Sequence, residues 1–128
     1  MKNISPHVQI YKFPLTAISS ITNRITGLGL TGMYIGLGTS CLLNQNQTLI
    51  DKYDKSNQII KTGINYMILF PNIYHTYGGL RHFIWDKYPQ YITNKLAHKS
   101  SIALFSISIL STILSERYIL NKNIKNIL

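Results

Sequence analysis

The sequence predicts an all-α integral membrane protein whose three transmembrane helices form half of a heterodimeric helix bundle. Three long stretches are nearly free of formal charge: the only Asp, Glu, Lys or Arg in residues 15–43 is Arg24, and residues 64–80 and 100–115 contain none of these four. A membrane-spanning helix needs about 20 mostly apolar residues. The predicted spans are residues 20–43, 62–85 and 99–120. Three helices alone would not shield Arg24 and His75 from lipid, so we expect a partner chain with further helices.

The remaining segments are polar and are interpreted as loops and a tail: residues 44–58, 87–99 and 121–128. The alternative is a soluble bundle of three buried helices, for which the 128-residue chain, 45% hydrophobic, has little polar sequence to cover the surface. No internal repeat or linker interrupts the chain, so residues 1–128 are predicted to be one domain.

Net charge is +9, and three spans place the N-terminus and the second loop on the same side of the membrane. That side carries seven lysines and arginines and the other six, so the positive-inside rule only weakly favours placing the N-terminus in the matrix or cytoplasm. The basic residues flank apolar spans and do not line one face, which argues against nucleic-acid binding. Cys41 is the only cysteine, which excludes an internal disulfide.

The first helix should begin near Pro14, because a proline suits the first helical turn. Ser20, Arg24 and Gly27 then share one face. A hydroxyl and a guanidinium one turn apart at the membrane edge suit a ligand with carbonyl or carboxylate oxygens. The alternative is an arginine that extends to the lipid headgroups beside a serine bonded to the backbone.

The second helix carries ionisable side chains that are costly within a membrane, and these indicate a functional site. His75, Gly79 and His82 lie near one face, where the glycine leaves room for a flat ring such as haem. His75 and His82 are about 10 Å apart along the axis, at 1.5 Å per residue, so they cannot both ligate one iron. A second ligand would come from another chain or, within this chain, from Met33. A buried histidine bonded across helices is the alternative.

Trp85 and Tyr88 at the end of this helix are typical of an interfacial aromatic belt. The third helix is the weakest prediction, because its uncharged part is short and rich in serine. Serine hydroxyls can bond back to the helix backbone or across to a neighbouring helix, so a span there is acceptable.

Three motifs together resemble the cytochrome b556 membrane-anchor subunits of succinate dehydrogenase, respiratory complex II. They are Ser5–Tyr11 (SPHVQIY), Phe13–Gly27 (FPLTAISSITNRITG) and His75–Asp86 (HTYGGLRHFIWD). They occupy the N-terminal quarter of the chain and the end of the second helix. The loop at 44–58 and the third helix carry no motif of this family.

The resemblance implies that the chain is no enzyme alone but a non-flavin subunit of succinate:ubiquinone oxidoreductase. A flavoprotein subunit would oxidise succinate and an iron–sulfur subunit would pass on the electrons. This chain and a second small anchor would hold haem b and help to form the ubiquinone site. His75 matches the axial haem ligand, with the other ligand from the partner chain. Ser20, Ile21 and Arg24 match the quinone site, and Arg24, Arg81 and His82 are expected near the haem propionates.

The sequence departs from this family at Asn23, where histidine often makes a further propionate contact. Two alternatives stay open: a haem-free structural anchor, and the anchor of a fumarate reductase-type complex. Asp86 is expected to pair with a nearby arginine in preference to delivering protons. The family places the chain in the mitochondrial inner membrane, and abundant isoleucine and asparagine fit an organelle genome; a bacterial inner membrane is the alternative.

Overall fold

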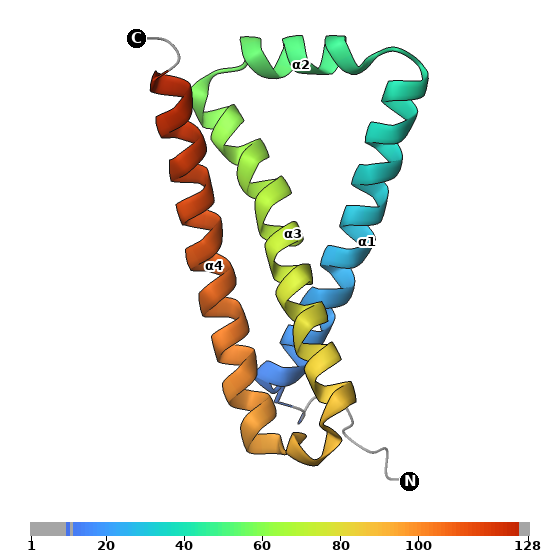
Figure 1. Ribbon diagram of the computed structural model, residues 1–128, viewed down its shortest axis with the longest axis vertical. Coiled ribbons are helices and arrows are strands. Elements are labelled where there is room, and N and C mark those ends of the chain that lie inside the picture. Colours follow the sequence, from blue (N-terminus) through green and yellow to red (C-terminus); the bar gives the residue numbers. More distant parts are fainter. Residues whose placement is uncertain (1–9, 11, 126–128) are drawn as a thin grey trace, which may run out of the picture.

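The computed structural model describes residue 10 and residues 12–125, the side chains of residues 122–125 excepted. Most of the Ser5–Tyr11 motif, including His7, therefore lies outside the described residues. The described chain is all-helical (Figure 1). Its elements in order are α1 (Leu15–Leu42), α2 (Asn46–Lys55), α3 (Gln58–Lys87), the 3₁₀ turn η2 (Pro89–Tyr91) and α4 (Asn94–Lys125).

The three long helices alternate in direction, and the short helix α2 lies across one end of the molecule (Figure 1). Helices α3 and α4 run antiparallel side by side, whereas α1 crosses α3 and then diverges from it toward α2. The start of α1 and the turn between α3 and α4 therefore lie at the same end. This is the arrangement that places the predicted site residues of α1 and α3 next to each other.

The prediction of a loop at residues 44–58 was wrong, because most of this segment forms α2. Asn44 ends α1 in a left-handed conformation, with φ of 53°. Its N–H donates to the Cys41 carbonyl and that of Gln45 to the Ser40 carbonyl, a Schellman motif that turns the chain sharply. Asparagine tolerates this conformation better than most residues. The α2 helix can then begin at Asn46.

The predicted loop at residues 87–99 and the predicted tail at 121–128 were too long, and side-chain caps mark where α3 and α4 begin. Asn57 caps α3, since its side chain accepts a hydrogen bond from the Ile60 N–H at 2.9 Å. Thr93 does the same for α4, accepting from the Leu96 N–H at 3.2 Å. The second loop is therefore reduced to a short connection that includes η2, and α4 continues through Lys125 into the predicted tail.

The interior is polar and the surface apolar, the reverse of a soluble bundle. Among the described residues, the only buried hydrophobic side chains are Tyr74 and Leu104. The others that are buried are polar: Ser19, Thr26, Ser101, Ser108, Thr112 and Glu116. Large isoleucine and leucine side chains on all the long helices are instead exposed. Small and hydroxyl-bearing residues between helices are typical of membrane bundles, where apolar side chains face lipid or partner helices.

By length and apolar composition, two helices qualify as membrane spans: residues Leu15–Leu42 and Asn94–Asn121. The third long helix, α3, has 30 residues but is less apolar, because it contains the asparagines at 65 and 72 together with His75, Arg81 and His82. Pro71 lies inside it without ending it. The third span therefore stays a prediction.

Candidate functional site

His75 of α3 packs against α1 where the two helices cross. Its Nδ1 lies 3.0 Å from the backbone carbonyl oxygen of Asn23. A carbonyl only accepts hydrogen bonds, so Nδ1 carries a proton, and in the neutral imidazole the lone pair lies on Nε2. A metal-bound histidine typically donates its second ring N–H to such a carbonyl, which fixes the tautomer and the ring orientation. The described residues provide no hydrogen-bond partner for Nε2.

Two glycines allow the helices to approach at this crossing. A Cβ added to Gly27 would lie 2.7 Å from Cε1 of His75, and one added to Gly78 would overlap Oδ1 of Asn23. Gly27 thus provides the space that the imidazole ring occupies. The Oδ1 of Asn23 is buried against Gly78 and has no hydrogen-bond partner within the described chain.

The His75 side of α3 is open beyond this contact. Gly79 is exposed, and a Cβ added there would meet no atom within 4 Å. His82 is also exposed, with its ring at 5.8 Å from the Trp85 ring, edge to face. His75, Gly79 and His82 therefore border one accessible face, as the spacing predicts.

Met33 does not meet His75 in this arrangement. At about 100° and 1.5 Å per residue, Met33 points about 120° away from Gly27 and lies about 9 Å farther along α1. The two helices diverge in that direction (Figure 1). The structure therefore does not support ligation by Met33 within the chain.

Ser20 and Arg24 lie beside the same crossing. Ser20 is half-buried and Arg24 exposed, and neither has a hydrogen-bond or ion-pair partner among the described residues. Other hydroxyls of α1 bond back to their own helix, as Thr26 and Thr31 do. The Ser20 hydroxyl thus forms no bond to its own helix within the described residues, contrary to the backbone-bonded alternative.

Ile21 lies at the outer border of this surface. It is exposed, and at 100° per residue it is about 100° around α1 from Ser20. It therefore offers an apolar contact at the lipid-facing edge and does not point into the helix crossing.

Arg81 is separated from this group. It lies about 120° around α3 from His75, facing α4, where its Nη1 donates to the Ser101 hydroxyl at 3.1 Å. Its guanidinium lies over the Trp85 ring, 4.8 Å from the centroid. The structure does not bring Arg81 to the open face of His75. The expected pairing of Asp86 with an arginine is wrong for the described residues, where Asp86 is exposed and forms no ion pair.

Tyr74 is a structural residue that sequence reasoning missed. It is fully buried, and its hydroxyl lies 3.1 Å from the Ser19 carbonyl oxygen and 3.2 Å from the Ser19 hydroxyl. Its ring packs on Phe70 and on Phe105 of α4. One side chain thereby joins all three long helices and fixes the residue next to His75.

A second polar chain lies at the α2 end. The Tyr53 hydroxyl donates to Asn65 at 2.9 Å, and the Asn65 amide donates to Glu116 at 3.3 Å. Glu116 is 1% exposed, and its other carboxyl oxygen is buried without a partner in the described part of the chain. This chain joins α2, α3 and α4.

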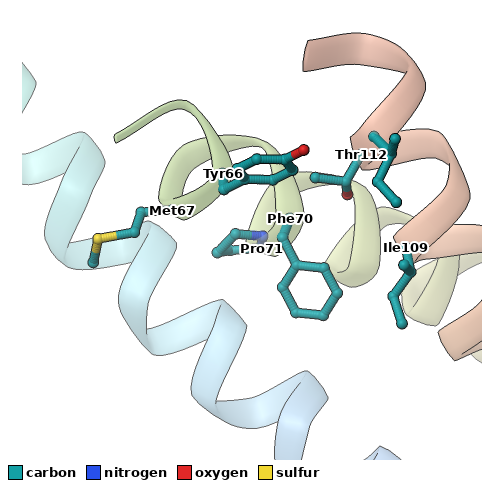
Figure 2. A pocket seen from close by; sticks show the side chains of 7 residues that line it. Tyr66, Met67, Phe70, Pro71, Ile109 and Thr112 are labelled. Carbon is teal, nitrogen blue, oxygen red and sulfur yellow. The ribbon is translucent and has the colours of Figure 1, made fainter. Parts of the chain in front are cut away.

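A cavity of about 640 Å³ lies between α3 and α4 (Figure 2). Tyr66, Met67, Phe70 and Pro71 line it from α3 and Ile109 and Thr112 from α4. It contains no charged group and none of the predicted site residues. No cluster of three or more histidine, cysteine or acidic residues occurs within the described chain that would hold a free metal ion.

Comparison with known proteins agrees with the resemblance in the motifs. Residues 1–115 match the family model of the succinate dehydrogenase/fumarate reductase transmembrane subunit. The succinate dehydrogenase cytochrome b560 subunit of Bos taurus mitochondria is 30% identical over 115 residues, which cover 86% of this chain and 67% of that protein. The cytochrome b556 subunit of Paracoccus denitrificans is 32% identical over 116 residues, covering 88% and 87%.

A third relative is the cytochrome b560 subunit of Reclinomonas americana, 34% identical over 91 residues, which cover 65% of this chain and 62% of that protein. The family match extends over most of the chain, including both the α1 and the α3 sides of the helix crossing. The chain therefore belongs to the family of succinate dehydrogenase/fumarate reductase transmembrane subunits.

Proposed function

We propose that this chain is a membrane anchor of succinate:ubiquinone oxidoreductase that crosses the inner membrane with α1, α3 and α4 and binds haem b with a second small anchor. The observation that carries the proposal is the orientation of His75, whose Nδ1 proton is held by the Asn23 carbonyl. The names of the relatives, cytochrome b subunits of succinate dehydrogenase from mitochondria and from Paracoccus, agree with it. The proposed location is the mitochondrial inner membrane, or the inner membrane of a bacterium.

The half-bundle arrangement explains the surface of the three helices. The ionisable side chains of His75 and His82 on the open face make α3 costly to expose to lipid alone. A second anchor on the open face of His75 would cover them. The soluble flavoprotein and iron–sulfur subunits would dock at the membrane surface.

The residues around His75 fit a haem group. The Nε2 lone pair is available for iron, and the open surface at Gly79 leaves room beside it for the flat ring. The described residues place no second axial ligand at this face, so that ligand would come from the partner anchor. Arg24 and His82 would hold the propionates, whereas Arg81 faces α4. When bound, haem b supplies a one-electron redox centre within the membrane.

Ser20 and Arg24 would bind the ubiquinone headgroup. The serine hydroxyl and the guanidinium can both donate to a quinone carbonyl oxygen, and the fixed positive charge stabilises negative charge that develops there during reduction. Ile21 would contact the apolar part of the ring. Both donors lack partners within the described residues, so binding would not require breaking an existing bond.

This site can be tested in the purified complex with Ser20→Ala and Arg24→Ala. Loss of one donor to developing charge typically lowers the turnover rate by a factor of about 100 or more. We expect ubiquinone reduction to fall in both variants while succinate oxidation by an artificial acceptor is retained. Ser40→Ala is the control, because the Ser40 hydroxyl bonds to the Leu37 carbonyl of its own helix. Unchanged ubiquinone kinetics in both variants would contradict the assignment.

A haem-free structural anchor is the second candidate, and one observation favours it. The Asn23 side chain is packed against Gly78 and cannot carry charge, so it offers no cationic contact to a propionate. In that case the complex would show no b-type absorption, and docking of the soluble subunits would be the main role of this chain.

A further inference from the structure

A second groove lies between α3 and α4, near the turn that joins them. Its volume is about 360 Å³. Arg81 and Trp85 of α3 and Ser100, Ala103 and Leu104 of α4 are among its lining residues. It faces away from the His75 surface. Of its lining residues only Arg81 was expected near the haem, and Arg81 faces α4 and not the open face of His75.

The charge of Arg81 is not balanced within the described chain. Its Nη1 donates to Ser101, its Nε is buried without a partner, and no acidic side chain in the described residues forms an ion pair with it. A guanidinium has five N–H donors in a planar fork, which matches phosphate oxygens in a bidentate manner. Arg81 therefore retains both charge and donors for an anionic group.

The groove is polar at one end and apolar along its length. Trp85 is followed by Tyr88 and Tyr91, residues that are typical of the headgroup level of a membrane. The Arg81 guanidinium lies over the Trp85 ring and so extends toward that level. From Trp85 the groove continues to Tyr77, about 12 Å deeper at 1.5 Å per residue, along apolar side chains such as Leu104.

The surroundings of the groove are basic. Lys87, Lys95 and Lys99 lie at the same end, and Asp86 is the only acidic residue between Lys55 and Ser115. Each of these lysines attracts an anionic headgroup electrostatically, whereas a neutral helix of a partner protein would leave the positive charge of Arg81 unbalanced. Charge and shape together favour an amphiphile with a phosphate group and a hydrocarbon chain.

We propose that this groove binds an anionic phospholipid, with its phosphodiester at Arg81 and an acyl chain along the seam between α3 and α4. The inference rests on the proposed three-span arrangement, because the groove must lie within a bilayer. It does not depend on haem ligation or on the quinone site.

Native mass spectrometry of the delipidated complex, with lipid added back, tests the proposal. We expect one phosphatidylglycerol to be retained, at least ten times more strongly than phosphatidylcholine. Arg81→Gln should lower retention about tenfold. Ala103→Phe should also lower it, because the ring fills the groove without changing the charge. Lys52→Gln is the control, an exposed cation of α2 at the opposite end of the molecule, and should retain the lipid.

Several outcomes would overturn the proposal. These are wild-type retention in both Arg81→Gln and Ala103→Phe, equal retention of the two phospholipids, or displacement of the lipid by equimolar inorganic phosphate. Loss of subunit assembly in Ala103→Phe with unchanged lipid retention would show that a partner helix occupies the groove. Absorption spectra and ubiquinone kinetics of the same samples separate the lipid proposal from the proposed function. If the complex lacks haem but its lipid retention depends on Arg81, only the proposed function is contradicted.

Discussion

At the scale of single residues, the contact between Gly27 and His75 explains how the imidazole ring is held in one orientation against α1. The carbonyl of Asn23 fixes one nitrogen, and the absence of a side chain at Gly27 lets the ring lie against α1. A hydrogen bond to the second ring nitrogen of a metal-binding histidine fixes the orientation of its ring and raises its basicity. This residue-level geometry was not evident from the motif, which places Gly27 only on the same face as Ser20 and Arg24.

Gly27→Ala should displace the His75 ring, because the added Cβ would lie 2.7 Å from Cε1. Overpacking of this kind typically costs about 1–3 kcal/mol. We expect less haem per complex, measured from the b-type absorption of the purified protein. Gly29→Ala is the matched control, since a Cβ there would meet no atom within 4 Å. Equal haem content in the two variants would show that Gly27 does not position the ligand.

Tyr74→Phe should weaken the packing of α3 on α1. The substitution removes the hydroxyl that bonds to Ser19, and hydrogen bonds between membrane helices are worth about 0.6 kcal/mol on average and up to about 1.7 kcal/mol. The expected result is a small loss in the free energy of unfolding in detergent. Tyr118→Phe, at a side chain that is 71% exposed, is the control and should leave stability unchanged. A stability equal to wild type would contradict the role of Tyr74.

At the scale of elements, the long apolar stretches gave the three main helices, but the sequence pattern missed α2. Its residues are polar enough to resemble a loop, and only the pairing of Tyr53 with Asn65 on another helix shows what the segment does. The burial of Tyr74 was missed for a similar reason: an aromatic residue in an apolar stretch could equally face lipid. The separation of Arg81 from His75, in contrast, follows from their spacing of six residues, which places them about 120° apart around the helix, and could be predicted from the sequence.

Tyr53→Phe should loosen α2 without affecting the site. It removes the bond to Asn65 that connects α2 to α3 and, through Glu116, to α4. We expect faster amide hydrogen exchange in residues 46–55 and unchanged exchange in α3 around His75. Tyr91→Phe, in the turn η2 at the other end, is the control. Unaltered exchange throughout α2 would mean that the polar chain does not hold this helix.

At the scale of the whole molecule, the apolar surface and polar interior fit a helix bundle that faces lipid or partner helices and not water. The open face bordered by His75, Gly79 and His82 offers one candidate axial ligand, His75, and the described residues place no second ligand opposite it. The family match accounts for this, because these subunits belong to a transmembrane complex. Sequence motifs identified the family and the candidate residues, but they could not show which faces remain open, since that depends on how α1 crosses α3.

The most direct test of the account is the reduced-minus-oxidised absorption spectrum of the purified complex, in wild type and in His75→Ala and His82→Ala. We expect a b-type band in the wild type that is lost in His75→Ala, since His75 alone among the described histidines has its Nδ1 held by a backbone carbonyl. His82→Ala should retain the band, because His82 would contact only a propionate. A wild-type complex without the band, or a band that persists in His75→Ala, would contradict the assignment of His75 as the axial ligand.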